Sequence, residues 1–546
     1  MNFVDKAKKL IEKEIGSKSP INWSYPPQES LGHLSFPCFI FDGNPVDKSE
    51  ELTESLKKKS AVLKIFKDIK AVGPYLNFFF KDEIILNNET KKIARQKGAV
   101  LVEFSNANTH KEYHIGHLRN ISYGDSVVKI LRASGQDAKA ISYINDFGIH
   151  TAKTVWQLKE AKNEEKNKGA WLGKLYAQAS AKLHENPELK ETVSQAMANI
   201  ESLKGPDYKL WQKSRKWSIK YFAKIYKELD IKFDHIFYEH EVIASGLKTV
   251  KELEKKNILE MSQGALIANL EKYKLGVLPF IRSDGTALYP VADIELAKIK
   301  AKKYKAISSI YVVDIRQSLY FKQLFKVLEL SGAKEKLIHL AYEFVSLPEG
   351  AMSSRSGNIV SYPQGRQMAS DRAFSETKKR HEDWSNKKIS QVANELAIAA
   401  LKFEMLKVGR QEEIVFSPEQ ALRFDGYTAV YIEYTYARLQ SLKNKVKYKS
   451  TKIDWAKFPA DYEIPLAWKI AKYPEAVAKA AEKFDPAEIA KYLFELAKNI
   501  NDYYQKVNII KSDKDLQSAR LEILNRAGET IKEGLNLLGI KTLKEM

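Results

Sequence analysis

Cysteine is nearly absent from this 546-residue sequence, in which Cys38 is the only one. A single cysteine excludes an intrachain disulfide and a cysteine-rich zinc site, so we expect no structural zinc. Long apolar runs are also missing, because none reaches the roughly 18 residues that a membrane-spanning helix needs. The opening segment, residues 1–16, is charged throughout, unlike a signal peptide. We therefore expect a cytoplasmic protein with no membrane partner.

Acidic residues are scarce relative to basic ones: Lys and Arg number 89, Asp and Glu 69, and the net charge is +20. Such an excess favours a polyanionic partner, either nucleic acid or an anionic surface. The alternative is a lysine-rich, solvated surface without a specific partner. Hydrophobic residues make up 44% of the chain, which is typical of a folded globular protein. The length exceeds what one core accommodates, so we expect three or more domains.

Secondary-structure signals change along the sequence and predict a multidomain α/β protein. A doubly wound, Rossmann-type parallel sheet is expected at its centre, preceded by a small α+β domain and followed by an all-α helical bundle. The expected bounds are 1–96 for the N-terminal domain, 97–385 for the catalytic domain and 386–546 for the bundle. Within the catalytic domain, the charged, helical stretch at about 151–238 is interpreted as an insertion.

The parallel sheet is predicted from residues 98–144. GAVLVEFS (98–105) is almost continuously apolar, as buried parallel strands are. An amphipathic helix is expected from Ile115 to Ser134, followed by Gly135 at the position of a C-terminal cap. AKAISYI (138–144) reads as the next strand. Strand, helix, strand is the first unit of a nucleotide-binding α/β sheet.

Two histidines, His114 and His117, flank a glycine where that first strand meets its helix. Ligands of doubly wound sheets bind beyond the carboxyl ends of the strands, and exposed amides at a helix N-terminus favour anions. Histidines three residues apart project from one face of a helix, and Gly116 lets a flat ring approach the backbone. The pattern predicts ATP binding, with His114 and His117 stabilising charge during attack at the α-phosphorus. A chance pair of surface histidines is the alternative.

This segment resembles the ATP-binding signature of class I aminoacyl-tRNA synthetases, specifically the arginyl-tRNA synthetase family. Other stretches resemble the family in the same order along the chain: VGPYLNFFF (72–80), EFSNAN (103–108), SYINDFG (142–148), DGTALYPVADIELAK (284–298), YVVDIRQSLYFKQLF (311–325), AMSSRSGN (351–358) and FDPAEIAKYLFELAKNINDYY (484–504). The resemblance implies ATP-dependent ligation of L-arginine to tRNA(Arg) by a monomer, with Mg²⁺ entering with ATP, and an anticodon-binding C-terminal domain.

Matching the family motifs residue by residue gives an expected arginine pocket. A guanidinium offers five donors in a fixed fork, so its pocket should present carboxylate, amide and phenol oxygens. Asp293 is the expected guanidinium partner and Tyr289 a wall of the pocket. Glu103 is expected to hold the α-ammonium group or to order the strand end; the other expected members are Asn108 and Gln323. The alternatives are a surface Asp293 paired with Lys298 or a neighbour and a solvated Gln323 amide.

The second signature loop, at about 348–358, departs from the family pattern. Ala351 and Ser354 stand where lysines would contact the phosphates, although Met352 and Ser353 are kept as expected ATP-binding residues. Arginyl-tRNA synthetases without the loop lysine commonly carry a lysine three residues before the first signature histidine. By that resemblance Lys111 supplies the missing charge, with Arg355 as a second candidate; the alternative is an exposed loop lysine. A further departure is Tyr320, where many members have histidine.

The resemblance also gives expected tRNA contacts. In the segment YIEYTYARLQ (431–440), aromatic and basic side chains are expected to stack on and pair with splayed anticodon bases. The candidates are Tyr431, Tyr434, Arg438, Tyr504 and Met546 in the helical domain and Asn77 in the N-terminal domain. The alternative for the aromatic residues is an ordinary place in a helical core.

Two other functions stay open from the sequence. The missing loop lysine is compatible with a catalytically inactive tRNA-binding or regulatory paralogue. A class I synthetase for lysine is the second, because lysine is also cationic. A cysteine-specific enzyme is excluded, because its zinc thiolate site needs more than one cysteine.

Overall fold

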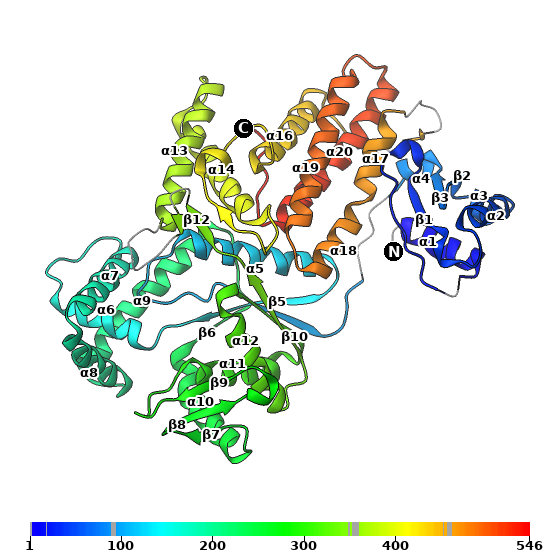
Figure 1. Ribbon diagram of the computed structural model, residues 1–546. Helices are drawn as coiled ribbons and strands as arrows, with labels where there is room; N and C mark the ends of the chain where they lie inside the picture. The colour runs from blue at the N-terminus through cyan, green and yellow to red at the C-terminus, as the bar shows by residue number, and fades with distance from the viewer. Residues whose placement is uncertain are drawn as a thin grey trace.

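The computed structural model describes residues 3–17, 19–88, 94–347, 350–351, 360–450, 453–455 and 461–546. A parallel sheet lies at the centre, with a helical bundle against one side of it and an α+β unit beside the bundle (Figure 1). The expected multidomain α/β architecture is therefore confirmed.

The N-terminal unit is an antiparallel sheet of order β1-β3-β2 with short helices. The family-like run at 72–80 holds a tight turn at Gly73, with φ of +55°, and then a strand. The elements are α1 (Phe3–Ile15), β1 (Leu34–Pro37), α2 (Pro45–Lys57), α3 (Ser60–Leu63), β2 (Phe66–Val72), β3 (Tyr75–Phe80) and α4 (Asp82–Leu86).

The central sheet has the order β11-β10-β4-β5-β6, and every neighbouring pair is parallel. Its central strand β4 is buried along its whole length, which explains why its sequence is continuously apolar. The strands are β4 (Ala99–Glu103), β5 (Asp137–Ile144), β6 (His235–Tyr238), β10 (Ala306–Asp314) and β11 (Lys336–Tyr342).

Helices cover both faces of this sheet. Val100 and Val102 belong to the core shared with α5 (Ile115–Ala133), whereas Leu101 points to the opposite core, shared with α10 (Glu239–Lys255) and α11 (Tyr289–Tyr304). Near this second face lie α12 (Ser318–Leu330) and an antiparallel sheet of β7 (Glu260–Ser262), β8 (Ala265–Asn269) and β9 (Val277–Ile281). The apolar runs at 264–270 and 276–281 thus form a sheet of their own.

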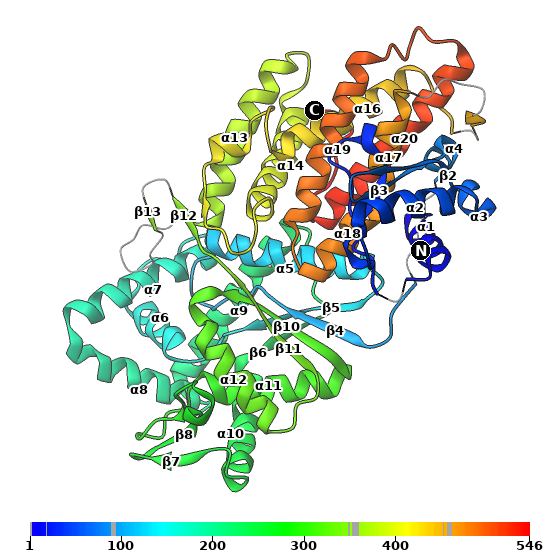
Figure 2. The ribbon, with the colours of Figure 1, turned by 45° about the vertical axis from the view of Figure 1, so that its right-hand side comes forward.

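Four helices connect β5 to β6: α6 (Ile149–Glu160), α7 (Lys168–Glu185), α8 (Lys190–Glu201) and α9 (Gly205–Glu228). They pack on one another at the edge of the sheet, away from the N-terminal unit (Figures 1 and 2). Figure 2 also shows β12 (Val345–Leu347) and β13 (Gly350–Ala351) above this insertion; their third strand is β14 (Ile414–Val415).

The C-terminal region is helical, as expected, and α5 packs between it and the sheet. Its helices are α13 (Tyr362–Arg380), α14 (Asn386–Leu406), α15 (Pro418–Ala421), α16 (Ala429–Lys445), α17 (Glu463–Ala471), α18 (Tyr473–Lys483), α19 (Ala487–Lys506) and α20 (Lys514–Leu537). Among the helices of the described residues, none combines the length and apolarity needed to cross a bilayer.

Candidate active site

A cavity of about 1010 Å³ lies at the carboxyl ends of the central strands. At one end it is lined by His114, Gly116 and His117, from the start of α5. At the other it is lined by Tyr289 and Asp293. The carboxyl ends of parallel strands meet at one edge of the sheet, where α5 begins, and the start of α11 lines the same cavity. Glu103, Asn108, Asn145, Asp314, Arg316 and Tyr320 also line it.

The signature histidines stack on each other, with 3.7 Å between their ring centroids. His114 is the N-cap of α5, and its backbone N–H donates to Nδ1 of His117 over 3.1 Å. Burial, together with the nearby charges of Lys111 and Arg316, lowers the pKa of His114 to about 4. Burial also holds the pKa of His117 well below its usual range. Both rings are therefore neutral at pH 7, and His117 has its Nε2–H free to donate to a phosphate.

Because these imidazoles are neutral, positive charge at this end must come from other groups. The Arg316 guanidinium lines the cavity, but it forms two 2.8 Å bonds to Asp314. The Lys111 ammonium lies 4.9 Å from the ring centroid of Tyr176, on α7. The three other predicted residues of this end, Met352, Ser353 and Arg355, lie outside the described residues.

At the opposite end, Asp293 is one helical turn after Tyr289, at the start of α11. The Tyr320 hydroxyl donates to Oδ2 of Asp293. Burial, together with the Glu103 charge, raises the pKa of Asp293 to about 7, against the lowering effect of the Tyr320 hydrogen bond. The alternative pairing with Lys298 is wrong, because the Lys298 ammonium contacts Glu252 at 3.5 Å. Asp293 is thus a carboxylate that faces the cavity without a cation partner among the described residues.

Glu103 ends β4, and its carboxylate is shared between two neighbours. One oxygen forms a buried ion pair with Lys300, and the other accepts from the Asn106 amide over 3.2 Å. The Lys300 ammonium also lies 4.3 Å from the ring centroid of Tyr311. Glu103 is therefore held in one orientation at the cavity wall.

Gln323 is not among the cavity residues, although an arginine contact was predicted for it. It is buried on α12, and its amide donates to the backbone oxygens of Leu275 and Val277 over 2.7 and 3.2 Å. The amide is therefore taken up by the chain around the start of β9. The alternative, a solvated amide, is wrong, since the side chain is buried.

Several residues at the cavity were not predicted from the sequence. Tyr143 and Asn145 stand at the end of β5, and Arg316 directly follows β10. Glu239 follows β6 and does not line the cavity; burial, together with the charges of Asp146 and Asp293, raises its pKa to about 8. The position after a strand was the available signal, because ligands of such sheets bind there.

The candidate tRNA residues differ in how they are presented. Tyr434 is 43% exposed, whereas the Tyr431 hydroxyl accepts from the Asn501 amide over 2.9 Å. The Arg438 guanidinium lies 3.9 Å from the ring centroid of Tyr504, so these two candidates stack on each other. Met546 packs partly buried against the core.

Asn77, the candidate tRNA residue of the N-terminal unit, is not accessible at the surface. Its side chain is buried, and its oxygen accepts from the Ser35 hydroxyl over 2.5 Å. The structure does not present Asn77 to a partner, because the predicted position points into the β1–β3 pair rather than outward.

Comparison with protein families matches two regions of the chain. Residues 82–418 match the catalytic domain of class I tRNA synthetases of the arginine type, "tRNA synthetases class I (R), catalytic domain". Residues 432–546 match the DALR anticodon binding domain.

Curated relatives and solved structures agree with these matches. The chain is 35% identical to an arginine–tRNA ligase of Bdellovibrio bacteriovorus, over 95% of this chain and 93% of the relative. It is 32% identical to one of Halothermothrix orenii over the full length of both. Among solved structures, the arginyl-tRNA synthetase of Thermus thermophilus matches with a TM-score of 0.85 and 25% identity, over 100% of this chain and 99% of the other.

Proposed function

The chain belongs to the class I arginyl-tRNA synthetases, and we propose that its large cavity holds arginine at one end and ATP at the other. As an arginine–tRNA ligase, it activates L-arginine with ATP to arginyl-adenylate and transfers the arginyl group to the 3′ end of tRNA(Arg). The observation that carries the site proposal is that His114 and Asp293, from different helices, line one cavity.

At the arginine end, the guanidinium pairs with Asp293, whose carboxylate has no cation partner among the described residues. Tyr320 orients that carboxylate by its hydrogen bond, and Tyr289 covers the pocket. Glu103, fixed by Lys300, accepts from the α-ammonium group. The arginine carboxylate then faces the histidines and attacks the α-phosphorus of ATP, with pyrophosphate leaving.

At the ATP end, the neutral imidazoles donate hydrogen bonds, and Gly116 admits the adenine ring. Lys111 supplies the positive charge that the second signature loop does not, because Ala351 and Ser354 replace its lysines. Electrostatic stabilisation requires a cation near the phosphates rather than a particular side chain, so an ammonium from the preceding loop serves. By their match to the family's signature loop, we also assign Arg355 a catalytic role and Met352 and Ser353 a role in ATP binding.

Mg²⁺ enters with ATP and is held mainly by phosphate oxygens and water. The Asp314 carboxylate lines the cavity beside Arg316 and is the type of oxygen ligand that Mg²⁺ prefers. Tyr434 and the stacked pair of Arg438 and Tyr504 contact the anticodon, with Tyr431 and Met546 supporting that surface.

The remaining proposals concern the whole chain. We place the N-terminal tRNA-contacting unit at 1–96, the catalytic domain at 97–385 and the anticodon-binding bundle at 386–546. The antiparallel sheet β1-β3-β2 lies within the first and the parallel sheet within the second, whereas α13, at the end of the second, packs on α14 of the third. The enzyme acts in the cytoplasm as a monomer.

The test is arginine-dependent exchange of pyrophosphate into ATP, measured with and without tRNA, together with aminoacylation of purified tRNA. Arginine is expected to support both reactions, and lysine neither. Exchange supported by lysine and not by arginine would contradict the arginine pocket. Tight tRNA binding without exchange or aminoacylation would instead favour the inactive paralogue.

A further inference from the structure

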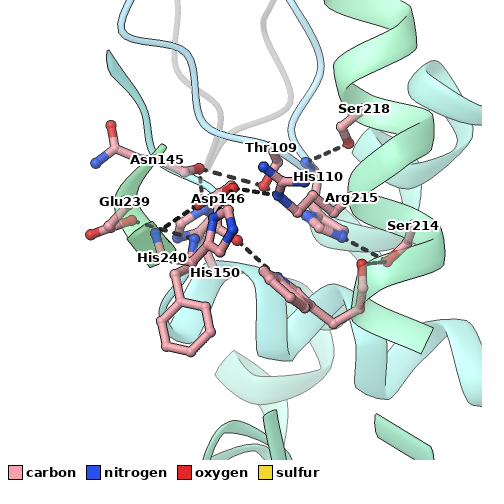
Figure 3. Close-up of polar contacts among 12 residues, drawn as sticks. Thr109, His110, Asn145, Asp146, His150, Ser214, Arg215, Ser218, Glu239 and His240 are labelled. Carbon is pink, nitrogen blue, oxygen red and sulfur yellow. Dashed lines mark hydrogen bonds and ion pairs between the residues drawn. The ribbon is translucent and has the colours of Figure 1, made fainter. Parts of the chain in front are cut away.

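The loop that carries Lys111 packs against the helical insertion as well as against the end of β5. His110, which precedes Lys111, is fully buried and adopts a left-handed backbone conformation with φ of +63°. Its backbone N–H donates to the Ser218 hydroxyl over 2.9 Å, and its ring Nε2 lies 2.8 Å from the Ser214 hydroxyl (Figure 3). Both serines are on α9, one turn apart. One helix of the insertion therefore holds both the backbone and the ring of His110.

The other side of the His110 ring is also bonded. The His110 Nδ1 lies 2.9 Å from the Thr109 hydroxyl. The Thr109 backbone N–H in turn donates to the backbone oxygen of Asn145 over 2.9 Å. Asn145 lines the cavity at the end of β5. Burial, together with the charges of His150 and Arg215, lowers the pKa of His110 to about 3, so the ring stays neutral at physiological pH. A left-handed residue persists only where its surroundings hold it, as the three bonds of His110 to Ser218, Ser214 and Thr109 do.

A second helix of the insertion, α7, contacts the next residues of the loop. A Cβ on Gly173 would lie 2.9 Å from the backbone N of Glu112 and 3.1 Å from its Cα, so only glycine allows this approach. Tyr176, one turn later on the same helix, has its ring centroid 4.9 Å from the Lys111 ammonium. The insertion thus contacts the residue before Lys111, the residue after it, and the ammonium itself.

The insertion is fixed relative to the sheet by a buried aspartate. Asp146 follows Asn145 and forms an ion pair with Arg215 of α9 (Figure 3). The same carboxylate accepts from the backbone N–H of His240 over 3.0 Å and contacts the His240 ring at 2.7 Å. The Trp211 indole donates to the Asp146 backbone oxygen over 2.8 Å. α9 is therefore tied to the carboxyl ends of β5 and β6, where the cavity lies.

We propose that the helical insertion α6–α9 positions Lys111, with Ser214, Ser218 and Gly173 as positioning residues and His110 as the link. This inference rests on the proposed role of Lys111 in the attack at the α-phosphorus. A positive charge displaced by about 1 Å stabilises the transition state of such a transfer much less. Support of the loop by two helices would prevent that displacement. Tyr176 holds the ammonium by a cation–π contact until the phosphates replace the ring.

The experiment is a double-mutant cycle measured by arginylation of tRNA in steady state. Ser214→Ala with Ser218→Ala is made in the wild-type chain and in the Lys111→Ala chain. The serine pair is expected to lower kcat by about 10- to 100-fold with the arginine KM unchanged. Lys111→Ala is expected to lower kcat by about 100-fold. In the Lys111→Ala chain, the two serine changes are expected to cause no further loss of kcat, because they act only through the position of Lys111.

Two variants accompany the cycle. Gly173→Ala, which displaces the loop from the α7 side, is expected to follow the same pattern. Ser180→Ala is the matched control, since that hydroxyl on α7 has no hydrogen-bond partner among the described residues and lies outside the contact; it is expected to leave kcat unchanged.

The outcomes separate this inference from the role of Lys111. If the kcat losses of the serine pair and of Lys111→Ala multiply in the combined variant, the serines act independently of Lys111 and the positioning inference is overturned. A serine pair that acts only by unfolding the protein would give this multiplicative result. A rise in the arginine KM would also overturn the inference, and both results leave the role of Lys111 in place. A normal kcat in the serine variant beside a slow Lys111→Ala enzyme would overturn it as well. A fully active Lys111→Ala enzyme would remove the role of Lys111, and the inference with it.

Discussion

At the residue scale, the arginine end of the cavity is dominated by carboxylates. Asp293 and Glu103 line it, and Glu239 stands behind them at the end of β6. One cation, Lys300, is committed to Glu103 by a buried ion pair. The remaining negative charge suits a ligand with two positive groups, because buried carboxylates are stable only when they are paired or protonated. The raised pKa values of Asp293 and Glu239 reflect the same deficit of cations.

Asp293→Asn is expected to lower kcat/KM for arginine by an amount that corresponds to about 2–5 kcal/mol of transition-state free energy, because it removes one partner of a buried charge pair. The loss should fall on the arginine KM, with the ATP KM nearly unchanged. Steady-state exchange kinetics measure both. Asp284→Asn is the matched control, since that carboxylate is exposed in the loop before α11. An unaltered arginine KM in the Asp293 variant would show that the guanidinium binds elsewhere.

The affinity for arginine is expected to fall as the pH falls. Burial raises the pKa of Asp293 to about 7 in the empty cavity, so the protonated fraction grows below that pH. Only the ionised carboxylate pairs with a guanidinium, and kcat/KM for arginine should therefore drop about tenfold between pH 8 and pH 6. A pH series of exchange rates tests this, and Asp293→Asn should flatten the profile. A profile that keeps its slope in that variant would assign the titration to Glu239.

At the element scale, the position of α11 sets the arginine pocket, because this helix carries both Tyr289 and Asp293. It packs closely on α10, where Gly246 leaves room for its backbone: a Cβ there would lie 2.5 Å from the Val291 oxygen. Val291 is two residues before Asp293. A side chain on Gly246 must therefore move α11 or α10, since a backbone atom cannot rotate away.

Gly246→Ala is expected to destabilise the fold by about 1–3 kcal/mol through overpacking and to raise the arginine KM more than the ATP KM. Urea unfolding and exchange kinetics give the two quantities. Ser245→Ala, at the neighbouring position of α10, serves as control, because its hydroxyl bonds only to the Val242 oxygen of the same helix. Equal changes in the two KM values would mean that α11 does not transmit the shift to Asp293.

At the scale of the whole molecule, α5 is shared between regions and the N-terminal unit is joined to the C-terminal helices. α5 packs on the sheet and on α14, α18 and α20, so the signature histidines stand at the end of a helix braced by the bundle. In Figures 1 and 2 the N-terminal unit lies against α17, on the side away from the insertion. The contact centres on Trp468, whose ring packs with those of Phe3, Tyr25, His33 and Phe80.

Trp468→Ala is expected to cost about 3–5 kcal/mol of stability and to separate the unfolding of the N-terminal unit from that of the bundle, because it empties their shared core. Calorimetry measures the transitions. Phe39→Ala is the control, since that ring is 63% exposed on the same unit. The arginine KM should stay constant in both, as the cavity is remote from this contact. A single transition at the wild-type temperature would contradict the role given to Trp468.

The sequence by itself determined the features that depend on neighbouring residues. The apolar run at 98–105 predicts a buried parallel strand and forms β4, and α5 begins at Ile115, as expected. Tyr289 and Asp293 share a helix face because a helix turns every 3.6 residues. Period, capping and motif order are local properties, so a sequence carries them directly.

Only the tertiary structure decided which partner each side chain takes. It turns the Gln323 amide to β9, buries Asn77 against Ser35, and gives Lys298 to Glu252 instead of Asp293. It also brings the insertion to His110 and Lys111. These contacts join segments that are far apart in the sequence and are brought together by the order of the strands and the packing of the helices. No local sequence pattern encodes such long-range proximity. The chemistry can be read from the motifs, whereas its positioning is a property of the packed molecule.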